Sequence, residues 1–66
     1  MSMLKVIEVL AESDNSWEDA AQNAVATAAE TLHGIKSIYI KEMEAVVEDN
    51  QITKWRLNAN ITFLLD

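Results

Sequence analysis

Toward its C-terminal end the chain alternates apolar and polar residues over Leu57 to Leu64, with the sequence LNANITFL. A period of two places successive side chains on opposite faces, so this segment is predicted to be a β-strand with one buried face. The apolar face consists of Leu57, Ala59, Ile61 and Phe63. The polar face consists of Arg56, Asn58, Asn60 and Thr62. Amides, a hydroxyl and a guanidinium bind ligands or line enclosed spaces, so the polar face is the first candidate for a functional surface.

The length of the chain limits how it can be stabilised. Its 66 residues are expected to form one domain, spanning 1–66. A domain of this size buries only about 60% of the surface that its unfolded chain exposes, and such scaffolds usually need disulfides, a metal or oligomerisation. The sequence has no cysteine and a single histidine, which excludes disulfides and argues against a structural zinc site. Self-association is therefore expected, and a hydrophobic fraction of 50% agrees with it.

The charge of the chain restricts its partners. Eleven acidic and five basic residues give a net charge of −6, which opposes binding to nucleic acid and to anionic membranes. Such a surface is compatible with divalent cations, although solubility also explains it. No apolar run approaches the roughly 18 residues of a membrane span, and the N-terminal sequence is typical of a strand and not of a signal peptide. We therefore expect a cytoplasmic protein without nucleic-acid or membrane partners.

A strand and a helix are predicted in the first half of the chain. The aliphatic segment Leu4 to Leu10 indicates a first strand, which the polar run Ala11 to Asn15 is expected to end. Ser16 is the expected N-cap of a helix from Trp17 to His33, and Gly34 is its expected C-cap. The apolar stripe of this helix consists of Trp17, Ala21, Ala24, Val25, Ala28 and Leu32.

Two long strands are predicted in the second half, Ile35 to Glu48 and Ile52 to Leu65. Asp49-Asn50 is the expected turn between them, since both residues tolerate the left-handed region. The order is β-α-β-β, an α+β fold in which a three-stranded antiparallel sheet wraps around one helix. The two long strands are longer than one helix can cover, so we expect another copy of the chain to cover the rest.

The register of this hairpin predicts which residues share a face. A two-residue turn pairs Glu48 with Gln51, and the same register pairs Ile40 with Ala59. The expected solvent-facing side then carries Ser37, Tyr39, Lys41, Met43, Ala45 and Val47 beside Thr62, Asn60, Asn58, Arg56, Lys54 and Ile52. Two acidic residues do not fit this pattern, because they fall on the apolar side: Glu42 and Glu44.

Several local strings together resemble one known family, the dodecins, which are small β-α-β-β proteins. These strings are KVIEVLAES at Lys5 to Ser13, SWEDAAQNAV at Ser16 to Val25, and IYIKEMEAVVEDNQITKWRLNANITFLLD at Ile38 to Asp66. The resemblance covers nearly the whole chain without gaps. It implies a hollow homododecamer that is not an enzyme and that sequesters a flavin, such as riboflavin or FMN.

The resemblance also implies where a flavin would bind. In the best-known dodecins a tryptophan on the second strand stacks on the flavin ring, and a glutamine on the third strand hydrogen-bonds its edge. Alignment on Gly34 and Phe63 places these two positions at Ser37 and Arg56, which do not match. An aromatic residue, Tyr39, follows on the same face. The candidate cofactor-binding residues are therefore Ser37, Tyr39, Arg56 and Asn58. One branch of the family lacks the tryptophan and glutamine and is associated with calcium.

The same residues also have structural interpretations. Tyr39 and Arg56 provide either a stacking platform and a donor for a flat or anionic ligand, or a contact between subunits. Asn58 and Asn60 either bind a ligand or form a polar ladder across a subunit boundary. The two tryptophans are interpreted as core or interface anchors, Trp17 and Trp55.

The remaining polar residues leave two alternatives to a flavin-binding cage. The hairpin carboxylates offer oxygen ligands for calcium without the spacing of an EF-hand, and they also fit a solvated acidic edge: Glu42, Glu44, Glu48 and Asp49. The first alternative is a cage that does not bind flavin and holds a cation such as calcium or an anionic metabolite, or is purely structural. The second is a small enzyme, which is not expected because Ser16 and His33 are assigned to helix ends and no nucleophile–base pair is present.

Overall fold

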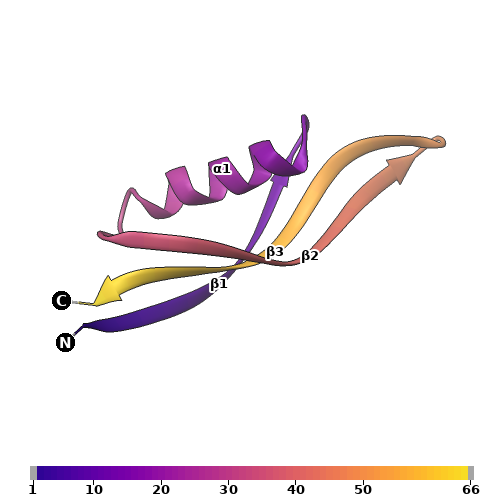
Figure 1. Cartoon of the computed structure of the whole chain (residues 1–66). Helices are drawn as coiled ribbons and strands as arrows, with labels where there is room; N and C mark the ends of the chain where they lie inside the picture. Colours follow the sequence, from indigo (N-terminus) through magenta and orange to yellow (C-terminus); the bar gives the residue numbers. More distant parts are fainter. Residues whose placement is uncertain (1, 66) are drawn as a thin grey trace.

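The computed structural model describes residues 2–65. Its elements are β1 (Met3–Ser13), α1 (Trp17–Ala28), β2 (Ile35–Glu48) and β3 (Gln51–Leu65). The strands form one antiparallel sheet in the order β1-β3-β2, and α1 lies across one face of it (Figure 1). This is the predicted α+β fold. Among these residues no helix is both long enough and apolar enough to cross a membrane.

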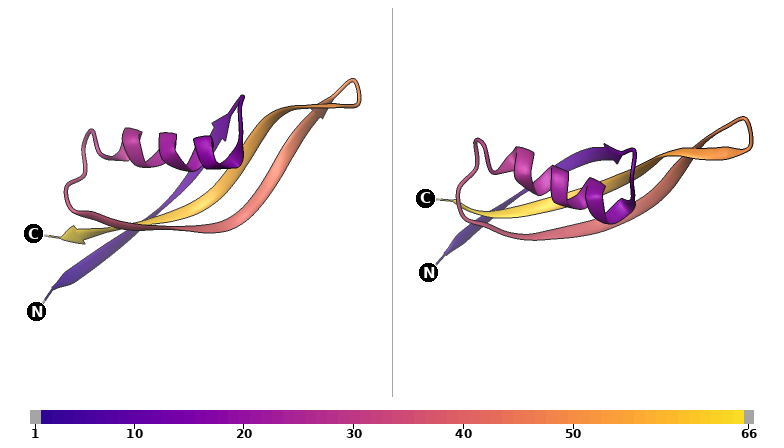
Figure 2. Two further views of the ribbon diagram at one scale, coloured as in Figure 1. Left: turned by 45° about the horizontal axis from the view of Figure 1, so that its top comes forward. Right: turned by 90° about the horizontal axis from the view of Figure 1, so that it is seen from above.

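The subunit is elongated, because the hairpin of β2 and β3 extends well beyond the helix (Figure 2). The chain measures 51 × 20 × 13 Å, with a radius of gyration of 13.5 Å. A compact chain of this length has a radius of about 11 Å. The accessible surface is 4911 Å², compared with about 4,200 Å² for a monomer of this mass. The excess surface is what a chain that packs against copies of itself is expected to show.

The core lies between α1 and the central strand β3. Its buried apolar side chains are Ala20, Leu57, Ala59, Ile61 and Phe63. The last four are the alternating apolar residues of β3, so the buried face that the period of two predicted is confirmed. The apolar stripe predicted for the helix is half-buried, which leaves part of α1 accessible along the side that the sheet does not cover.

Strand β1 continues beyond the predicted end at Leu10, and the prediction that Ala11 to Asn15 breaks the strand is wrong for its first three residues. Ala11 pairs with Leu57, Glu12 with Arg56, and Ser13 with Trp55. The polar Glu12 fits in the strand because its side chain points away from the helix and contacts the guanidinium opposite. Cross-strand charge pairing therefore outweighs the polar composition of this segment.

The start of α1 is joined to the end of β1 by side-chain hydrogen bonds. Ser16 is the N-cap, as predicted, and its Oγ accepts a hydrogen bond from the backbone N–H of Asp19 at 3.0 Å. The Asp19 carboxylate does not complete a capping box. Its Oδ2 instead accepts from Ser13 Oγ at 2.6 Å and from Asn15 Nδ2 at 3.3 Å. These hydrogen bonds, with that from Ser13 as the main cause, lower the pKa of Asp19.

The end of α1 differs from the prediction, because the helix stops at Ala28 with Ala29 as its C-cap and does not reach His33. Gly34 adopts a φ of 68° in the connection to β2, so it does not cap the helix. Its carbonyl accepts a hydrogen bond from Leu64 N at 2.9 Å, and a Cβ at this position would lie 3.0 Å from Leu64 Cβ. The helix ends early because the backbone must turn to bring this glycine against β3.

The hairpin turn agrees with the prediction, and so does the register next to the turn and at Ile40. Asp49 and Asn50 both have positive φ, at 52° and 64°, as a two-residue turn between twisted strands requires. Glu48 pairs with Gln51, and Ile40 pairs with Ala59.

The middle of the hairpin register differs from the prediction. Irregularities between Ile40 and Glu42 and between Val46 and Val47 shift the pairing of the intervening residues by one position. The structure therefore pairs Glu42 with Asn58, and the prediction that Met43 and Ala45 share the face of Arg56 is wrong. A bulge adds a residue to one strand and reverses the facing of those that follow, which an unbroken alternation does not show.

Candidate functional site

The sheet face opposite the helix, termed the open face here, carries more than half of the polar side chains of the strands. Its central row is the polar face of β3: Arg56, Asn58, Asn60 and Thr62. On one side the ladder places residues of β1 beside this row: Val6, Glu8, Leu10 and Glu12. On the other side it places residues of β2: Ser37, Tyr39, Glu42 and Glu44. Because β3 is the central strand in the order β1-β3-β2, its polar row has neighbouring strands on both sides, although β3 is the last strand in the sequence.

All four predicted site residues lie on the open face. Ser37 pairs with Thr62, and Tyr39 pairs with Asn60, with 66% of the Tyr39 side chain exposed. Arg56 and Asn58 lie closer to the hairpin turn, beyond the register shift between Ile40 and Glu42. The fold thus places the two pairs on one surface but in two regions, because only Arg56 and Asn58 line the pocket described next.

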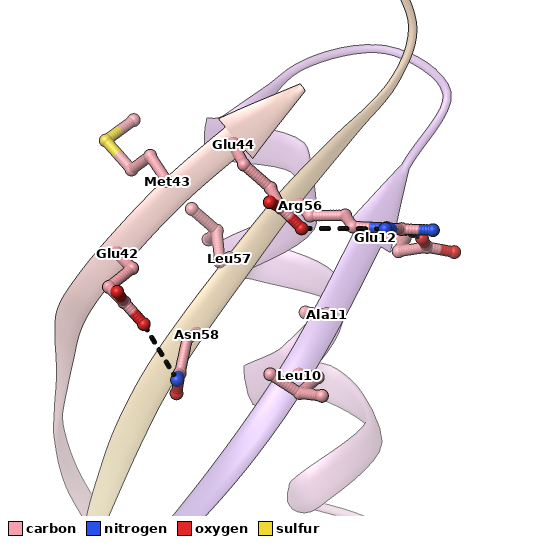
Figure 3. A pocket seen from close by; sticks show the side chains of 9 residues that line it. All are labelled: Leu10, Ala11, Glu12, Glu42, Met43, Glu44, Arg56, Leu57 and Asn58. Atoms are coloured by element: carbon pink, nitrogen blue, oxygen red, sulfur yellow. Dashed lines mark hydrogen bonds and ion pairs between the residues drawn. The ribbon is translucent and has the colours of Figure 1, made fainter. Parts of the chain in front are cut away.

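A pocket of about 580 Å³ lies where β2 is bulged. Its lining residues come from all three strands: Leu10, Ala11, Glu12, Glu42, Met43, Glu44, Arg56, Leu57 and Asn58 (Figure 3). Two of them offer apolar surface, since Leu10 is 82% exposed and Met43 is 56% exposed. The pocket therefore combines apolar side chains with hydrogen-bonding and charged groups, as small-molecule sites do.

The Arg56 guanidinium connects the three strands across one end of the pocket. Its Nε donates to Glu12 Oε2 on β1, and its Nη1 donates to Glu44 Oε1 on β2 at 3.5 Å (Figure 3). The hydrogen bond with Glu12, followed by the charge of that carboxylate, raises the pKa of Arg56. These groups are exposed and such pairs contribute little to stability, so the main effect of the contacts is to hold the guanidinium in place.

Asn58 lies beside this ion pair network and is only partly satisfied. Its Nδ2 donates to Glu42 Oε1 at 3.3 Å. Its Oδ1 is buried and accepts no hydrogen bond from the residues that the structure describes. A buried acceptor without a donor costs about 1–3 kcal/mol. A donor from a ligand or from a second copy of the chain would remove this cost.

Two further ion pairs lie on or near the open face. Lys41 Nζ contacts Glu8 Oε2 at 2.9 Å, and Lys54 Nζ contacts Asp14 Oδ1 at 3.0 Å. The hydrogen bond between Lys41 and Glu8 lowers the pKa of Glu8 and raises the pKa of Lys41, with the opposite charge of the partner as the second cause in each case. These two lysines are therefore engaged with carboxylates.

Trp17, at the start of the helix, contacts the bulged segment from the other side of the sheet. Its Nε1 donates to the backbone carbonyl of Glu44 at 3.1 Å. This bond fixes the part of β2 that carries Glu44 to the N-terminus of α1. It gives Trp17 a structural role in the chain, in agreement with its interpretation as an anchor.

The arrangement fits calcium and flavin differently. Within residues 2–65 no three His, Asp or Glu side chains are placed to hold a metal ion together. In the pocket, Arg56 lies between Glu12 and Glu44, where a cation would otherwise bind. One chain alone thus does not form a calcium site on this face. The exposed Leu10, beside an amide oxygen that lacks a donor, fits a flat ligand with apolar faces and N–H groups.

The lining residues that are not among the predicted cofactor-binding residues are Leu10, Ala11, Glu12, Glu42, Met43, Glu44 and Leu57. The sequence did contain a signal for Glu42 and Glu44, because charged side chains do not fit the apolar face on which the unbroken register placed them. A register shift on each side of this segment places them on the polar face instead. No comparable signal marked Glu12, since the polar composition of its segment suggested a loop.

Comparisons with known proteins agree with this fold. The family model that matches is Dodecin, over residues 3–66. Calcium dodecin from Mycobacterium tuberculosis is 30% identical over 63 residues, covering 96% of this chain and 89% of the relative. The solved structure of that protein, described as having a novel calcium-binding site, is 29% identical with a TM-score of 0.84, over 98% of this chain and 93% of the other.

A second solved structure is similar as well, the dodecin from Streptomyces coelicolor. It is 26% identical with a TM-score of 0.94, over 98% of this chain and 93% of the other. Its strands and helix therefore superpose on the elements described above along nearly their whole length. Because the family model spans 3–66 and the fold is shared, this chain belongs to the dodecin family.

Proposed function

We propose that the chain is the subunit of a non-enzymatic, homododecameric cage that binds a small ligand on its open face, with a flavin such as riboflavin or FMN as the leading candidate. The observation that carries this proposal is the pocket lined on the open face by Leu10, which is 82% exposed, and by Asn58, whose Oδ1 is unsatisfied. Membership in the dodecin family supports the same conclusion.

The described residues suggest how a flavin would be held. A flavin ring offers flat apolar faces and an edge with an N–H donor and carbonyl acceptors. Leu10 supplies apolar contact, and Asn58 supplies an acceptor for the N–H. Tyr39, exposed on the same face, is the aromatic residue available for stacking, because Ser37 has no ring. Such contacts bind and shield the ligand, and the pocket contains no nucleophile next to a base.

Assembly into a cage is supported by the surface of the isolated chain. Several large apolar side chains are more than half exposed on both faces of the sheet: Met3, Leu4, Val6, Leu10, Met43 and Val47. The projecting hairpin has no helix over it in this chain (Figure 2). A second copy is the simplest group to cover these surfaces. The absence of cysteine fits the proposed cytoplasmic location.

Calcium is the second candidate ligand, favoured by the 30% identity with calcium dodecin. Calcium takes six to eight oxygen ligands, which exceeds what one copy of this chain presents in one place. We therefore propose that any calcium site here would combine carboxylates from several copies, away from the guanidinium of Arg56.

Two measurements test the function. Light scattering should give a mass near twelve chains of 7.4 kDa, and a monomer would contradict the cage. Titration of riboflavin and of FMN should quench flavin fluorescence to saturation at a defined ratio of ligand to chain. Unquenched flavin together with calcium binding in calorimetry would instead support the second candidate.

A further inference from the structure

The charges that line the pocket do not balance. Three carboxylates belong to its wall, those of Glu12, Glu42 and Glu44, whereas Arg56 is its only cation among the described residues. Three negative charges and one positive charge leave a formal charge of −2. This local excess is independent of the net charge of the chain, because it concerns only groups that contact the same space.

The neighbouring lysines do not remove the excess. Lys41, next to Glu42 in sequence, directs its Nζ to Glu8 at 2.9 Å. Lys54 contacts Asp14 at 3.0 Å. Glu42 itself accepts a hydrogen bond from the neutral amide of Asn58, which satisfies the oxygen but supplies no opposite charge.

The single cation is also already engaged. Arg56 donates to Glu12 through Nε and to Glu44 through Nη1, so it bridges two carboxylates. An incoming anion would have to compete with both of them. Arginines that bind carboxylates or phosphates frequently do so in a bidentate manner, with two parallel N–H groups. Arg56 does not offer this arrangement, because its N–H groups already donate to Glu12 and Glu44.

We propose that the pocket selects flat ligands that carry no negative charge near it, and that it discriminates against phosphorylated ligands. Glu42 is the specificity-determining residue, since its carboxylate is paired with no cation. The proposal rests on the proposed function and specifies its ligand class: a neutral or cationic ring compound with an N–H donor, such as riboflavin, is preferred over its phosphate ester FMN.

The test compares riboflavin and FMN by fluorescence titration of the assembled protein. At an ionic strength of about 0.01 M, where charges act over about 30 Å, riboflavin should bind at least about tenfold more tightly than FMN, a difference of about 1.4 kcal/mol. At about 1 M salt, where this range falls to about 3 Å, the ratio should shrink toward one through stronger FMN binding.

Two variants locate the effect. Glu42→Gln removes one charge while keeping the shape and the acceptor for Asn58, and it should reduce the riboflavin preference several-fold. Glu48→Gln is the matched control, because Glu48 is an exposed glutamate of the same strand outside the pocket, and it should leave the preference unchanged. FMN binding as tight as riboflavin binding in the unaltered protein would overturn this inference and leave the proposed function standing. Failure of both flavins to bind would overturn both.

Discussion

Glu44 lies directly opposite Arg56 in the ladder of β2 and β3, with Glu44 Oε1 3.5 Å from Arg56 Nη1. The pair exists because two register shifts of the hairpin, one with the extra residue Lys41 in β2 and one with the extra residue Thr53 in β3, enclose the segment that carries Glu44 and turn it toward the open face. The same turn brings Glu42 to Asn58 and forms one wall of the pocket. The site therefore depends on two single-residue shifts, one in each strand of the hairpin, and its residues are neighbours only because both are present.

The close approach of Gly34 to β3 predicts that Gly34→Ala destabilises the protein. A Cβ would lie 3.0 Å from Leu64 Cβ, and alanine disfavours a φ of 68°. We expect a loss of about 1–3 kcal/mol in the free energy of unfolding, measured in urea at fixed protein concentration. Asn50→Gly is the reciprocal control, because Asn50 also has positive φ, and it should be neutral or stabilising. Unchanged stability in Gly34→Ala would contradict the close approach.

The buried face of β3 predicts a graded effect of side-chain size at Ile61, which is fully buried. Ile61→Val should lower the free energy of unfolding by about 0.5–1.5 kcal/mol, and Ile61→Ala by about 2–5 kcal/mol, because the lost methyl groups leave a cavity. Ile52→Val is the control, since Ile52 is 50% exposed near the turn. Equal losses at the two positions would show that the core is not confined to the part of β3 that the helix covers.

The hydrogen bonds to Asp19 predict a specific acid sensitivity. The hydrogen bond from Ser13 is the largest cause that lowers the pKa of Asp19 below its ordinary value of 3.8, and the hydrogen bond from Asn15 is the second. The folded state therefore binds this proton less readily than the unfolded state does. Its stabilising contribution is present above the ordinary pKa and is lost as the pH falls through the folded value. Asp19→Asn should flatten stability against pH in this acidic window, as followed by thermal unfolding. Glu18→Gln, next to it on the first turn, should leave the curve unchanged.

The fold was more predictable than the site, and the difference has a physical cause. The apolar face of Leu57 to Phe63, the cap at Ser16 and the turn at Asp49-Asn50 each follow from local chemistry, and all three are found in the structure. The contacts of the site depend instead on bulges, which change the register through tertiary packing. A regular alternation could not show that the misplaced Glu42 belongs next to Asn58.

The same limit applies to the helix end, although the element itself was correctly predicted. Helix-forming residues continue to His33, so local propensity favours a longer helix. The helix stops at Ala28 because the chain must reach Leu64 through Gly34. Packing against the sheet thus sets the boundary, and no local residue signals it.

The exposed ring of Tyr39 predicts a test of the ligand surface. Tyr39→Ala should weaken flavin binding about two- to tenfold, since a stacked aromatic contributes about 0.5–1.5 kcal/mol beyond its buried area. The variant should keep the mass of the assembly in light scattering, because the proposal assigns Tyr39 to the ligand and not to a subunit contact. Tyr39→Phe retains the ring and should bind as the unaltered protein does. Dissociation of the assembly in Tyr39→Ala would assign the residue to a subunit contact instead.

The substitution at Ser37 gives the most direct test of whether this open face can hold a flavin in the manner of other dodecins. Resemblance places the stacking tryptophan of the family at Ser37, which pairs with Thr62 on the open face and is exposed. A tryptophan at this position would project from the same surface as Tyr39 and would need no space in the core. Ser37→Trp should therefore tighten flavin binding by about tenfold and deepen the fluorescence quenching, because an indole ring quenches a flavin on which it stacks. Lys36→Trp adds the same ring one residue away and should not have this effect. Lys36 has no pairing partner in β3, because the register shifts between Ile35 and Ser37. If both variants bind flavin no better than the unaltered protein, stacking at this position does not limit affinity, and the pocket at Asn58 would then be the part of the face that determines binding.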